Sequence, residues 1–285
     1  MIKAMTFNIR VTNPFDIGNP WSKRKKLVVD RLASHGADVI GLQEVLNSQL
    51  KYIKKSLPGY STYSAGRSNG KTKGEACPIL YRTDRFTMLD SGTFWFSKTP
   101  DKPSTRFGNF CPRICSWVQL QDKNTGTGLY IYNLHLDNLS QSSRGKSVRQ
   151  LAKHIAARKT SEPFIVMGDF NMTLENPAMR YLQQIPDLQM TDAWLSVNSG
   201  KSNIGTRHNF SGKTNGPKID HIPISKNVQA LEVDIDQTDV NGKYPSDHYP
   251  VIAKILLKKP MARMKKRNDI FPELQGYRLK TLRTF

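Results

Sequence analysis

Residues 164 to 171 join an apolar run to a polar tetrapeptide, and this junction constrains the fold more than any other part of the chain. Phe164 to Met167 has the composition of a buried strand, and Gly168-Asp169-Phe170-Asn171 follows it directly. Residues i and i+2 of a strand point to the same side, so an extended backbone would bring Asp169 and Asn171 toward one substrate atom. The junction therefore predicts a buried strand that ends at a chemically active site.

Five other apolar runs adjoin polar residues in the same way. Four of them end at such a residue: 4–7 at Asn8, 39–43 at Glu44, 129–134 at His135, and 218–219 at Asp220. The fifth, 250–257, begins just after Asp247 and His248. Asp and Asn are common in turns, so any single case would indicate only a loop. Six cases together predict strand ends that converge on one site.

The residue types at these strand ends indicate the chemistry. Carboxylates together with Asn suit a hard cation such as Mg²⁺, with Mn²⁺ as the alternative. His beside Asp suits proton transfer. Both suit hydrolysis of a phosphoester, in which a cation neutralises the phosphate and stabilises the leaving oxygen. The sequence therefore predicts a metal-dependent phosphoester hydrolase.

Three residues are the candidate metal contacts. Glu44 is the lone acid at the end of a buried run, where an unpaired carboxylate is costly to desolvate, and a salt bridge to a lysine is the alternative to a metal. Asn8 is short and neutral, which suits it to hold a metal-bound water or a phosphate oxygen, or else to cap a turn. Asp247 is a further metal contact.

Proton transfer has two candidate residues. Asp169 can orient or deprotonate the attacking water, and Asn171 can hold a phosphoryl oxygen in the transition state. His248 is the second candidate, because a catalytic His needs a carboxylate to fix its tautomer. The sequence leaves open which of Asp169 and His248 is the base.

Seven segments resemble, in order and spacing, the successive motifs of the endonuclease/exonuclease/phosphatase superfamily, which has the deoxyribonuclease I-like fold. The resemblance implies an α/β protein, a four-layer α/β/β/α sandwich of two mixed sheets with the site at one edge. It covers residues 1–257. The segments are 6–10, 42–45, 74–82, 133–137, 168–171, 219–222 and 244–250.

The resemblance also implies roles for further residues. Asp220 supports His248, and Glu75 supports His135, which donates to the phosphate. The loop Thr206-Arg207-His208 resembles a family loop near the substrate, so Thr206 and His208 are candidate substrate contacts. Arg113 is a candidate anion contact, and a surface arginine is its alternative.

The charge of the chain favours an anionic partner. Lys and Arg number 43 against 23 Asp and Glu, a net charge of +20. Residues 258–285 hold nine basic and two acidic residues, a net +7, so they form a basic extension after the catalytic domain 1–257. Such a field attracts polyanions, and we expect nucleic acid to bind the basic surface and tail. A basic surface that serves only solubility is the alternative.

The sequence is consistent with two classes of substrate. Charge and motifs together favour a nuclease, a phosphodiesterase acting on nucleic acid. Abasic-site endonucleases, however, place an acid where this chain has Arg10, and His135-Leu136-Asp137 resembles small bacterial hydrolases, some of them phosphomonoesterases. The alternative is therefore a phosphomonoesterase acting on a small phosphorylated metabolite or lipid headgroup. A catalytically silent binding protein is the third reading.

Several general features complete the expectation. Met1-Ile2-Lys3 leads straight into the first strand without a secretory signal, so we expect an intracellular protein, in the cytoplasm or with the chromosome. No apolar stretch reaches the ~20 residues of a membrane span. We expect a monomer. Cys77, Cys111 and Cys115 lack paired spacing and are expected to be small buried residues.

Local patterns predict the main elements. A helix is predicted over 22–36, with Ser22 as its candidate N-cap, Gly36 as its stop and the basic cluster 23–26 on its solvated first turn. Polar segments at 60–74, 97–113 and 197–218 border the site as loops that choose the substrate. Further helices are predicted at 46–56, 144–159 and 176–184, and strands at 78–82, 115–120, 129–134, 163–167, 219–224 and 250–257.

Overall fold

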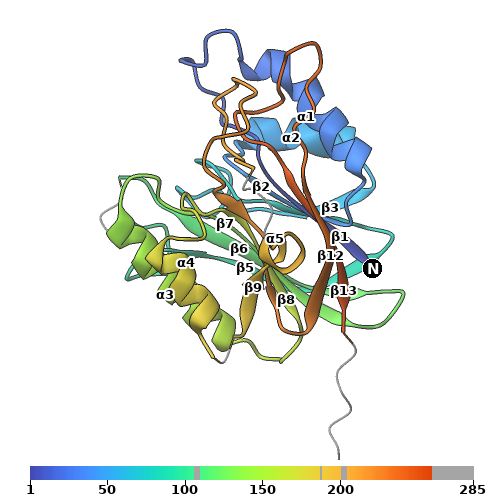
Figure 1. Cartoon of the computed structure of the whole chain (residues 1–285), viewed down its shortest axis with the longest axis vertical. Helices are drawn as coiled ribbons and strands as arrows, with labels where there is room; N and C mark the ends of the chain where they lie inside the picture. Colours follow the sequence, from blue (N-terminus) through green and yellow to red (C-terminus); the bar gives the residue numbers. More distant parts are fainter. Residues whose placement is uncertain (106–109, 187, 200–203, 259–285) are drawn as a thin grey trace, which may run out of the picture.

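Two β-sheets face each other in the computed structural model, and helices cover the outer surface of each sheet (Figure 1). The structure describes residues 1–105, 110–186, 188–199 and 204–258. The basic extension predicted at 258–285 lies outside the described residues from position 259 onward. No helix in the described ranges is long and apolar enough to cross a membrane.

The first sheet has six strands in the order β12-β13-β1-β2-β4-β3. β1 runs parallel to β2 and antiparallel to β13. In this register Asn8 lies opposite Gln43, so the strand ends that lead to Asn8 and Glu44 meet at one edge. The strands are β1 (Ile2–Asn8), β2 (Val39–Gln43), β3 (Tyr60–Tyr63), β4 (Ile79–Arg82), β12 (Val228–Ile235) and β13 (Val251–Leu257).

The second sheet has the order β5-β6-β7-β8-β11-β9, and β10 also pairs with β8. β7 and β8 are parallel, with His135 opposite Asp169, while Asp220 lies opposite Asp169 on its other side. Three predicted site residues are thus brought side by side by strand register. The strands are β5 (Phe86–Trp95), β6 (Ile114–Asp122), β7 (Gly128–His135), β8 (Phe164–Asp169), β9 (Met190–Asp192), β10 (Asp220–His221) and β11 (Pro223–Ser225).

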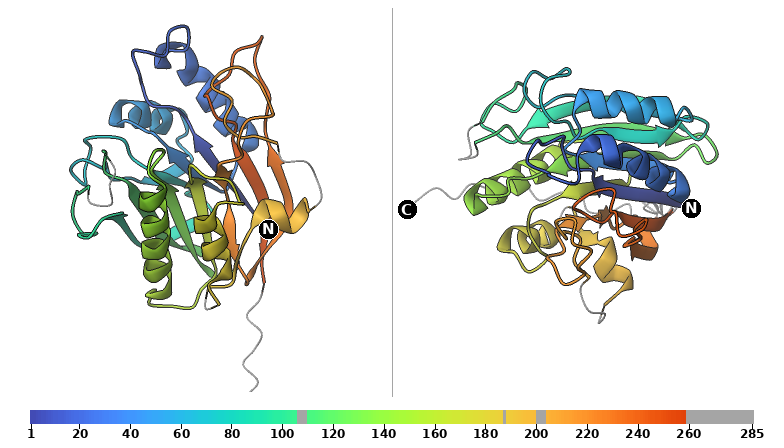
Figure 2. Two further views of the ribbon diagram at one scale, coloured as in Figure 1. Left: turned by 60° about the vertical axis from the view of Figure 1, so that its left-hand side comes forward. Right: turned by 90° about the horizontal axis from the view of Figure 1, so that it is seen from above.

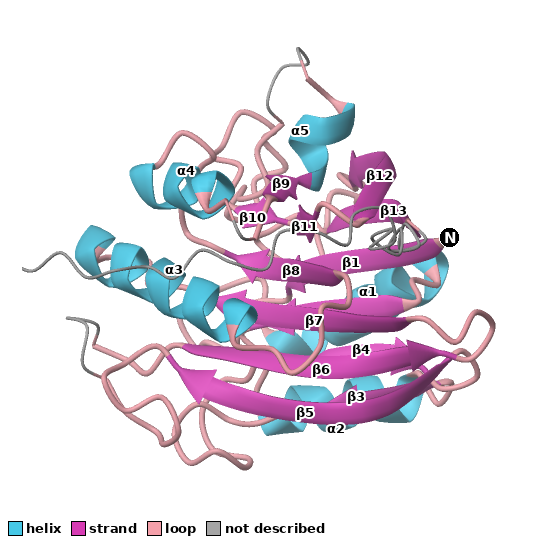
Figure 3. Cartoon of the chain, turned by 90° about the horizontal axis from the view of Figure 1, so that it is seen from below, coloured by secondary structure: helices cyan, strands magenta, loops and turns pink. Residues whose placement is uncertain are grey.

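Helices complete the four layers (Figures 2 and 3). α1 (Trp21–His35) and α2 (Asn47–Ser56) pack on the first sheet, and α3 (Gln141–Ala156) and α4 (Pro177–Gln184) pack on the second. The short α5 (Ala193–Val197) lies beside β12. The predicted four-layer α/β/β/α sandwich of two mixed sheets is confirmed.

The layers are held together by three apolar clusters. The largest lies between the sheets, where Val39 and Ile131 are fully buried. Leu32 of α1 packs in a second cluster on the first sheet, and Leu151 of α3 in a third on the second sheet. Each fully buried aliphatic side chain of this kind stabilises the fold by about 1.5–3 kcal/mol. The strand ends therefore rest on a rigid scaffold.

A buried polar bridge joins the sheets just below the site. Gln43 donates through Nε2 to Asn133 Oδ1 at 2.6 Å, and Asn133 Nδ2 donates to the carbonyls of Leu42 and Pro78. The sheets approach closely here, because a Cβ on Gly41 would lie 2.5 Å from Met167 Sδ. Gln43 precedes Glu44, so the bridge sets the spacing between that acid and the second sheet.

The local predictions hold for most elements and fail at identifiable places. α1 begins at Trp21 after an N-cap at Pro20 that makes no side-chain bond, so the prediction of Ser22 as the N-cap was wrong. Gly36 ends the helix in the left-handed region at φ 52°, as predicted. Segment 60–74 was expected to be loop, but it starts with the edge strand β3. The sequence patterns did not predict β5 and β12. In both strands several consecutive residues are not buried, so buried and exposed positions do not alternate regularly.

Two predictions about single residues were also wrong. Arg24 was expected on a solvated turn, yet its side chain is only 2% exposed. Cys111 was expected to be buried and is exposed, whereas Cys77 and Cys115 are buried. In both cases tertiary contacts, rather than neighbours in sequence, decide the burial.

Candidate active site

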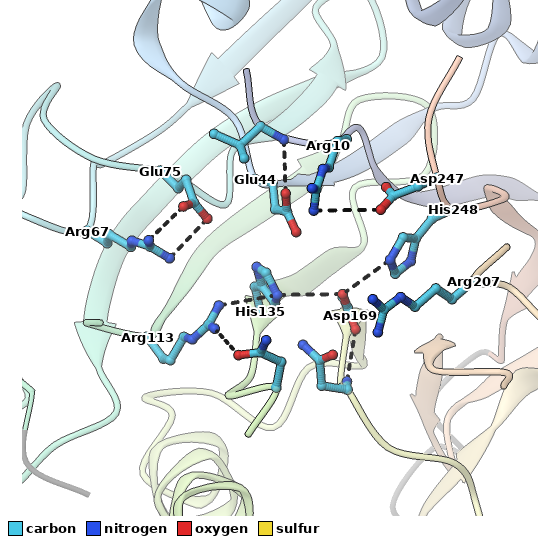
Figure 4. Close-up of a pocket in the computed structure, with 13 residues that line it drawn as sticks. Arg10, Glu44, Arg67, Glu75, Arg113, His135, Asp169, Arg207, Asp247 and His248 are labelled. Carbon is cyan, nitrogen blue, oxygen red and sulfur yellow. Dashed lines mark hydrogen bonds and ion pairs between the residues drawn. The ribbon is translucent and has the colours of Figure 1, made fainter. Parts of the chain in front are cut away.

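A pocket of about 200 Å³ opens where the strand ends of the two sheets meet (Figure 4). Every residue that lines it except Val11 carries a charged or polar side chain. Eight of the predicted site residues are among them: Glu44, Glu75, Arg113, His135, Asp169, Asn171, Asp247 and His248. The structure therefore brings most of the predicted residues together in one pocket.

Asp169 lies at the centre of the pocket, at the end of β8. Its Oδ1 accepts the backbone N–H of Asn171 at 2.9 Å, and its Oδ2 accepts Asn8 Nδ2 at 3.1 Å. Gly168 makes this placement possible, because a Cβ there would lie 2.1 Å from the carbonyl oxygen of Leu134. The glycine also has φ 149°, which side-chain-bearing residues rarely adopt.

Burial raises the pKa of Asp169 to about 7, and the neighbouring carboxylate of Asp220 adds to this rise. His248 acts in the opposite direction and lowers it. A carboxyl group whose pKa lies near neutrality is suited to accept a proton in a reaction at neutral pH. This environment supports the predicted role of Asp169 in activating water.

His248 lies between two carboxylates. Its Nδ1 is 2.8 Å from Asp220 Oδ2 and its Nε2 is 3.9 Å from Asp169 Oδ2. Burial opposes a charged imidazole here, but the carboxylates outweigh it and raise the pKa of His248 to about 10. The expected support of His248 by Asp220 is present, and the imidazole is positioned to act as a proton donor.

His135 lies on the other side of Asp169. Its Nε2 is 3.3 Å from Arg113 Nη1 and 3.5 Å from Asp169 Oδ2. Burial lowers the pKa of His135 well below its ordinary value, and the charges of Arg113 and Arg67 lower it further. The imidazole is therefore neutral at neutral pH, and its Nε2 accepts the hydrogen bond from Arg113.

Glu75 does not support His135 as the resemblance implied. Its carboxylate forms a two-point ion pair with Arg67, with Nη2–Oε1 at 2.6 Å and Nη1–Oε2 at 3.0 Å. The loop between these residues folds back, since Arg67 N–H also donates to the Glu75 carbonyl at 2.9 Å. A local pair formed in this way could not be foreseen from the strand pattern.

Glu44 faces the pocket without a cationic side chain. Its Oε1 accepts Asn8 Nδ2 at 3.1 Å and its Oε2 accepts the N–H of Val11 at 2.9 Å. Within the described ranges no Lys, Arg or His forms an ion pair with it, so the salt-bridge alternative does not apply. Glu44 also has φ 61°, a strained conformation for a residue with a side chain, and such strain is typical of functional sites.

The oxygen-rich donor set fits a divalent cation. Glu44 and Asp247 both line the pocket, and Asn8 lies between the carboxylates of Glu44 and Asp169. Their role as metal contacts stays a prediction. Bound at this site, a cation would neutralise phosphate charge and stabilise the leaving oxygen.

A second group of residues could also hold a metal ion. Asp169, Asp220 and His248 offer ligand atoms that all lie within 4.8 Å of one another. Asp220 Oδ1 is buried and has no hydrogen-bond partner among the described residues, so it is free to accept a ligand. The sequence predicts that these three residues take part in proton transfer. Their geometry makes them a candidate metal site as well.

Two predicted substrate contacts are not among the residues that line the pocket. Thr206 Oγ1 accepts the backbone N–H groups of Ile219 and Asp220, at 3.0 and 3.1 Å. His208 stacks on Tyr249 with ring centroids 3.9 Å apart. The structure therefore does not bring these two side chains together with the other candidates, and their contact with substrate stays a prediction.

Arg207, which stands between these two residues, lines the pocket instead. Neighbouring side chains of an extended backbone point to opposite sides. Arg207 can therefore line the pocket when Thr206 and His208 do not. The alternation is a signal that the sequence contained. Four further residues of the lining were not predicted: the apolar Val11 and the polar Arg10, Arg67 and Asn138.

Solved structures with a similar fold were found for most of the chain. An endonuclease/exonuclease/phosphatase protein of Bacteroides vulgatus is 32% identical with a TM-score of 0.85, over 90% of this chain and 99% of that chain. A mannosyl-6-phosphatase of Bacteroides thetaiotaomicron is 30% identical with a TM-score of 0.83, over 90% and 100%. An uncharacterized protein of Acanthamoeba polyphaga mimivirus is 28% identical over 81% of this chain and 91% of that protein.

The family model agrees with the geometry of the site. It is described as the Endonuclease/Exonuclease/phosphatase family and matches residues 5–248, a range that runs from β1 to His248. All the strand ends that line the pocket fall inside this range. The chain therefore belongs to the endonuclease/exonuclease/phosphatase family and is a phosphoester hydrolase.

Proposed function

We propose that this protein is a phosphomonoesterase that acts on a small phosphorylated metabolite such as a sugar phosphate. The observation that carries the proposal is the small volume of the pocket together with the residues that line it. At about 200 Å³ it is smaller than the ~300–1,000 Å³ common for organic ligands. It suits a phosphoryl group with a small organic group attached.

The lining also lacks the groups that hold a polynucleotide. None of the residues described around the pocket is Phe, Tyr or Trp. Proteins that bind single strands stack bases on such side chains, each stack contributing about 1–3 kcal/mol. Without them, the site has no evident means of holding the bases beside a scissile phosphate.

Arginines supply the anion-binding groups. Arg207 reaches the pocket, and in the described part of the chain the only hydrogen bond of its side chain is from Nε to Asn209 Oδ1 at 3.1 Å. Arg113 donates to Asn138 Oδ1 at 2.9 Å and to His135 Nε2 at 3.3 Å, and its Nε lies 3.7 Å from Asp137 Oδ2. A phosphomonoester carries up to two negative charges at neutral pH, against one for a diester, so the guanidinium of Arg207, which has no carboxylate partner among the described residues, favours the monoester.

The residues of the site then divide the reaction between them. Asp169 accepts a proton from the attacking water, and Asn171 holds a phosphoryl oxygen. His248, kept protonated by Asp220, donates a hydrogen bond to the phosphoryl group as its charge develops. Glu44 and Asp247 would hold a divalent cation at the pocket, where it would supply positive charge to the phosphate and the leaving oxygen.

The comparisons add support from a separate source. The mannosyl-6-phosphatase of Bacteroides thetaiotaomicron shares 30% of its residues with this chain and is matched over its whole length. Nucleic-acid enzymes of similar fold are more distant. Zebrafish TDP2, solved with a single-strand DNA product, is 17% identical with a TM-score of 0.70, a likeness that shows the fold alone.

The proposal is tested by comparing substrates under one set of conditions. Mannose 6-phosphate, other sugar phosphates, p-nitrophenyl phosphate, its bis ester, DNA and RNA are offered with Mg²⁺, with Mn²⁺ and with EDTA. Asp169→Asn controls for contaminating enzymes. We expect the highest kcat/KM for phosphomonoesters of small metabolites. Cleavage of nucleic acid or the bis ester without release of phosphate from any monoester would overturn the proposal.

Nuclease activity is the second candidate, and the net charge of +20 favours it. A basic surface draws polyanions whether or not its pocket can process them. Deletion of residues 260–285 in the same substrate panel separates the two effects. If the basic extension binds nucleic acid, deletion weakens binding and flattens its salt dependence by ~0.7–0.9 in log-log slope for each lost phosphate contact.

A further inference from the structure

Arg24, in the first turn of α1, is the most fully buried of the lysines and arginines that the structure describes. Only 2% of it is exposed. In the described ranges no carboxylate lies within ion-pair distance of its guanidinium. Burial lowers the pKa of Arg24 to about 10, so the group still carries its charge at neutral pH. A buried charge is costly unless its hydrogen bonds are satisfied. The hydrogen-bond acceptors around the Arg24 guanidinium therefore decide whether it is stable in this position.

The partners of Arg24 are backbone carbonyls from three separate segments. Nε donates to Asn19 O at 2.8 Å, and Nη1 donates both to Ile9 O at 2.8 Å and to Pro245 O at 2.7 Å. Nη2 donates to Arg10 O at 3.3 Å. The planar fork of a guanidinium can serve several acceptors at fixed angles, which a lysine ammonium cannot do.

These segments carry residues of the active site. Ile9 follows Asn8, the residue that donates to both Glu44 and Asp169. Pro245 stands two residues before Asp247. A second bond strengthens the same junction, since Ser246 Oγ donates to the Asn8 carbonyl at 2.6 Å.

A third segment of the site also touches Arg24. The guanidinium carbon lies 5.4 Å from the ring centroid of Phe210, in the loop that carries Arg207. On α1 itself the ring of Trp21 lies 5.6 Å away. Contacts of this kind contribute about 0.5–2 kcal/mol each. One side chain therefore contacts three loops that border the pocket, although it does not line the pocket itself.

We propose that Arg24 is a positioning residue for phosphoester hydrolysis: by holding Ile9, Arg10 and Pro245 together, it sets the spacing between the Asn8 side and the Asp247-His248 side of the pocket. The proposal rests on phosphoester hydrolysis by this site and not on the choice of a monoester. It is measured with whichever substrate the wild-type protein turns over, so failure of the proposed substrate class leaves the test of Arg24 intact.

The test compares Arg24→Ala, Arg24→Lys and the control Arg31→Lys. Arg31 lies on the same helix, two turns later, and pairs with Asp236 at 2.7 Å away from the pocket. We expect both Arg24 variants to lower kcat by ~10–100-fold with a smaller change in KM, because a shift of reacting groups by about 1 Å can cost ~100-fold. Arg31→Lys keeps the wild-type kcat. Circular dichroism and Tm establish the folded fraction of each variant.

Chemical rescue separates positioning from general stability. Millimolar guanidinium is expected to restore part of the kcat of Arg24→Ala, because it can refill the site between the carbonyls, whereas methylammonium does not. A folded Arg24→Ala protein with wild-type kcat, or one whose kcat guanidinium fails to raise, overturns the proposal. If Arg24→Ala does not fold, Arg24→Lys decides: wild-type kcat in a folded Lys variant overturns it.

Discussion

The Nδ1 of His248 lies 2.8 Å from the carboxylate of Asp220, and both groups are buried. Asp220 is held in turn by Thr206, whose hydroxyl accepts its backbone N–H at 3.1 Å. The imidazole can therefore turn only one nitrogen, Nε2, toward Asp169 and the pocket. Burial opposes the charged imidazole, but this contact, together with the charges of Asp169 and Asp247, raises the pKa of His248.

Loss of His248 should be more harmful than loss of its partner. His248→Ala is expected to lower kcat by ~100-fold or more, because a proton donor at the phosphoryl group is removed. Asp220→Asn keeps a hydrogen-bonding side chain beside the imidazole and is expected to be milder. Steady-state kinetics at saturating Mg²⁺ measure both. Near wild-type turnover in His248→Ala would show that another residue has this role.

Activity should depend on a divalent cation held by Glu44. EDTA is expected to abolish turnover, and Mg²⁺ or Mn²⁺ to restore it. Glu44→Gln removes the charge but keeps the side-chain shape, so it should raise the Mg²⁺ concentration needed for half activity. Titration of activity with Mg²⁺ measures the shift, and isothermal calorimetry provides a binding readout without turnover. Full activity in excess chelator would contradict the metal assignment.

Arg207 should act on substrate binding. Arg207→Gln is expected to raise KM by about tenfold or more, because a hydrogen bond to a charged group contributes about 1.5–3 kcal/mol. Arg82→Gln is the matched control, since Arg82 pairs with Asp84 on the surface and does not line the pocket. An unchanged KM in Arg207→Gln would remove Arg207 from the substrate site.

Gly168 should tolerate no side chain. In Gly168→Ala the new Cβ would meet the Leu134 carbonyl at 2.1 Å, and the φ of 149° alone costs about 1–3 kcal/mol. A lower Tm and a large loss of activity are expected, because Asp169 must move. Gly59→Ala is the control, since a Cβ at Gly59 has no atom within 4 Å. Equal Tm values for the two variants would refute this account of β8.

Stability at acid pH should depend on Asp236. Its Oδ2 lies 2.7 Å from both Arg31 Nη1 and His35 Nε2, and Thr238 donates to Oδ1 at 2.9 Å. Burial disfavours the charge of Asp236, but the hydrogen bonds from His35 and Thr238 and the charge of Arg31 hold its pKa well below the ordinary range.

The sign of the effect follows from that depressed pKa. The stabilisation is fully present above the unfolded pKa of about 3.9 and is lost as pH falls toward the folded pKa. Tm measured between about pH 5 and pH 3 should therefore fall more steeply in the wild type than in Asp236→Asn. Asp234→Asn, at an exposed position of β12, should keep the wild-type slope. Parallel curves for Asp236→Asn and wild type would contradict the assignment.

The sequence alone determined where the strands end and which polar residues stand there. Apolar runs followed by Asn8, Glu44, His135 and Asp169 predicted the site, because an apolar strand and the polar residue at its end are both visible over a few neighbouring residues. The ordered motifs further implied the family and the four-layer sandwich, and the structure and the comparisons confirm both. Strand register then brings these residues together as expected.

Tertiary structure decided the partners of the arginines and acids. Arg24 binds the carbonyl of Pro245, 221 residues away, and Glu75 pairs with Arg67 rather than supporting His135. Arg207 lines the pocket, whereas the predicted substrate contacts beside it, Thr206 and His208, do not. A sequence pattern reports periodicity over a few residues, whereas these contacts depend on how sheets and loops pack across the molecule. Side-chain direction and the choice among several possible partners are therefore set only when the whole fold forms.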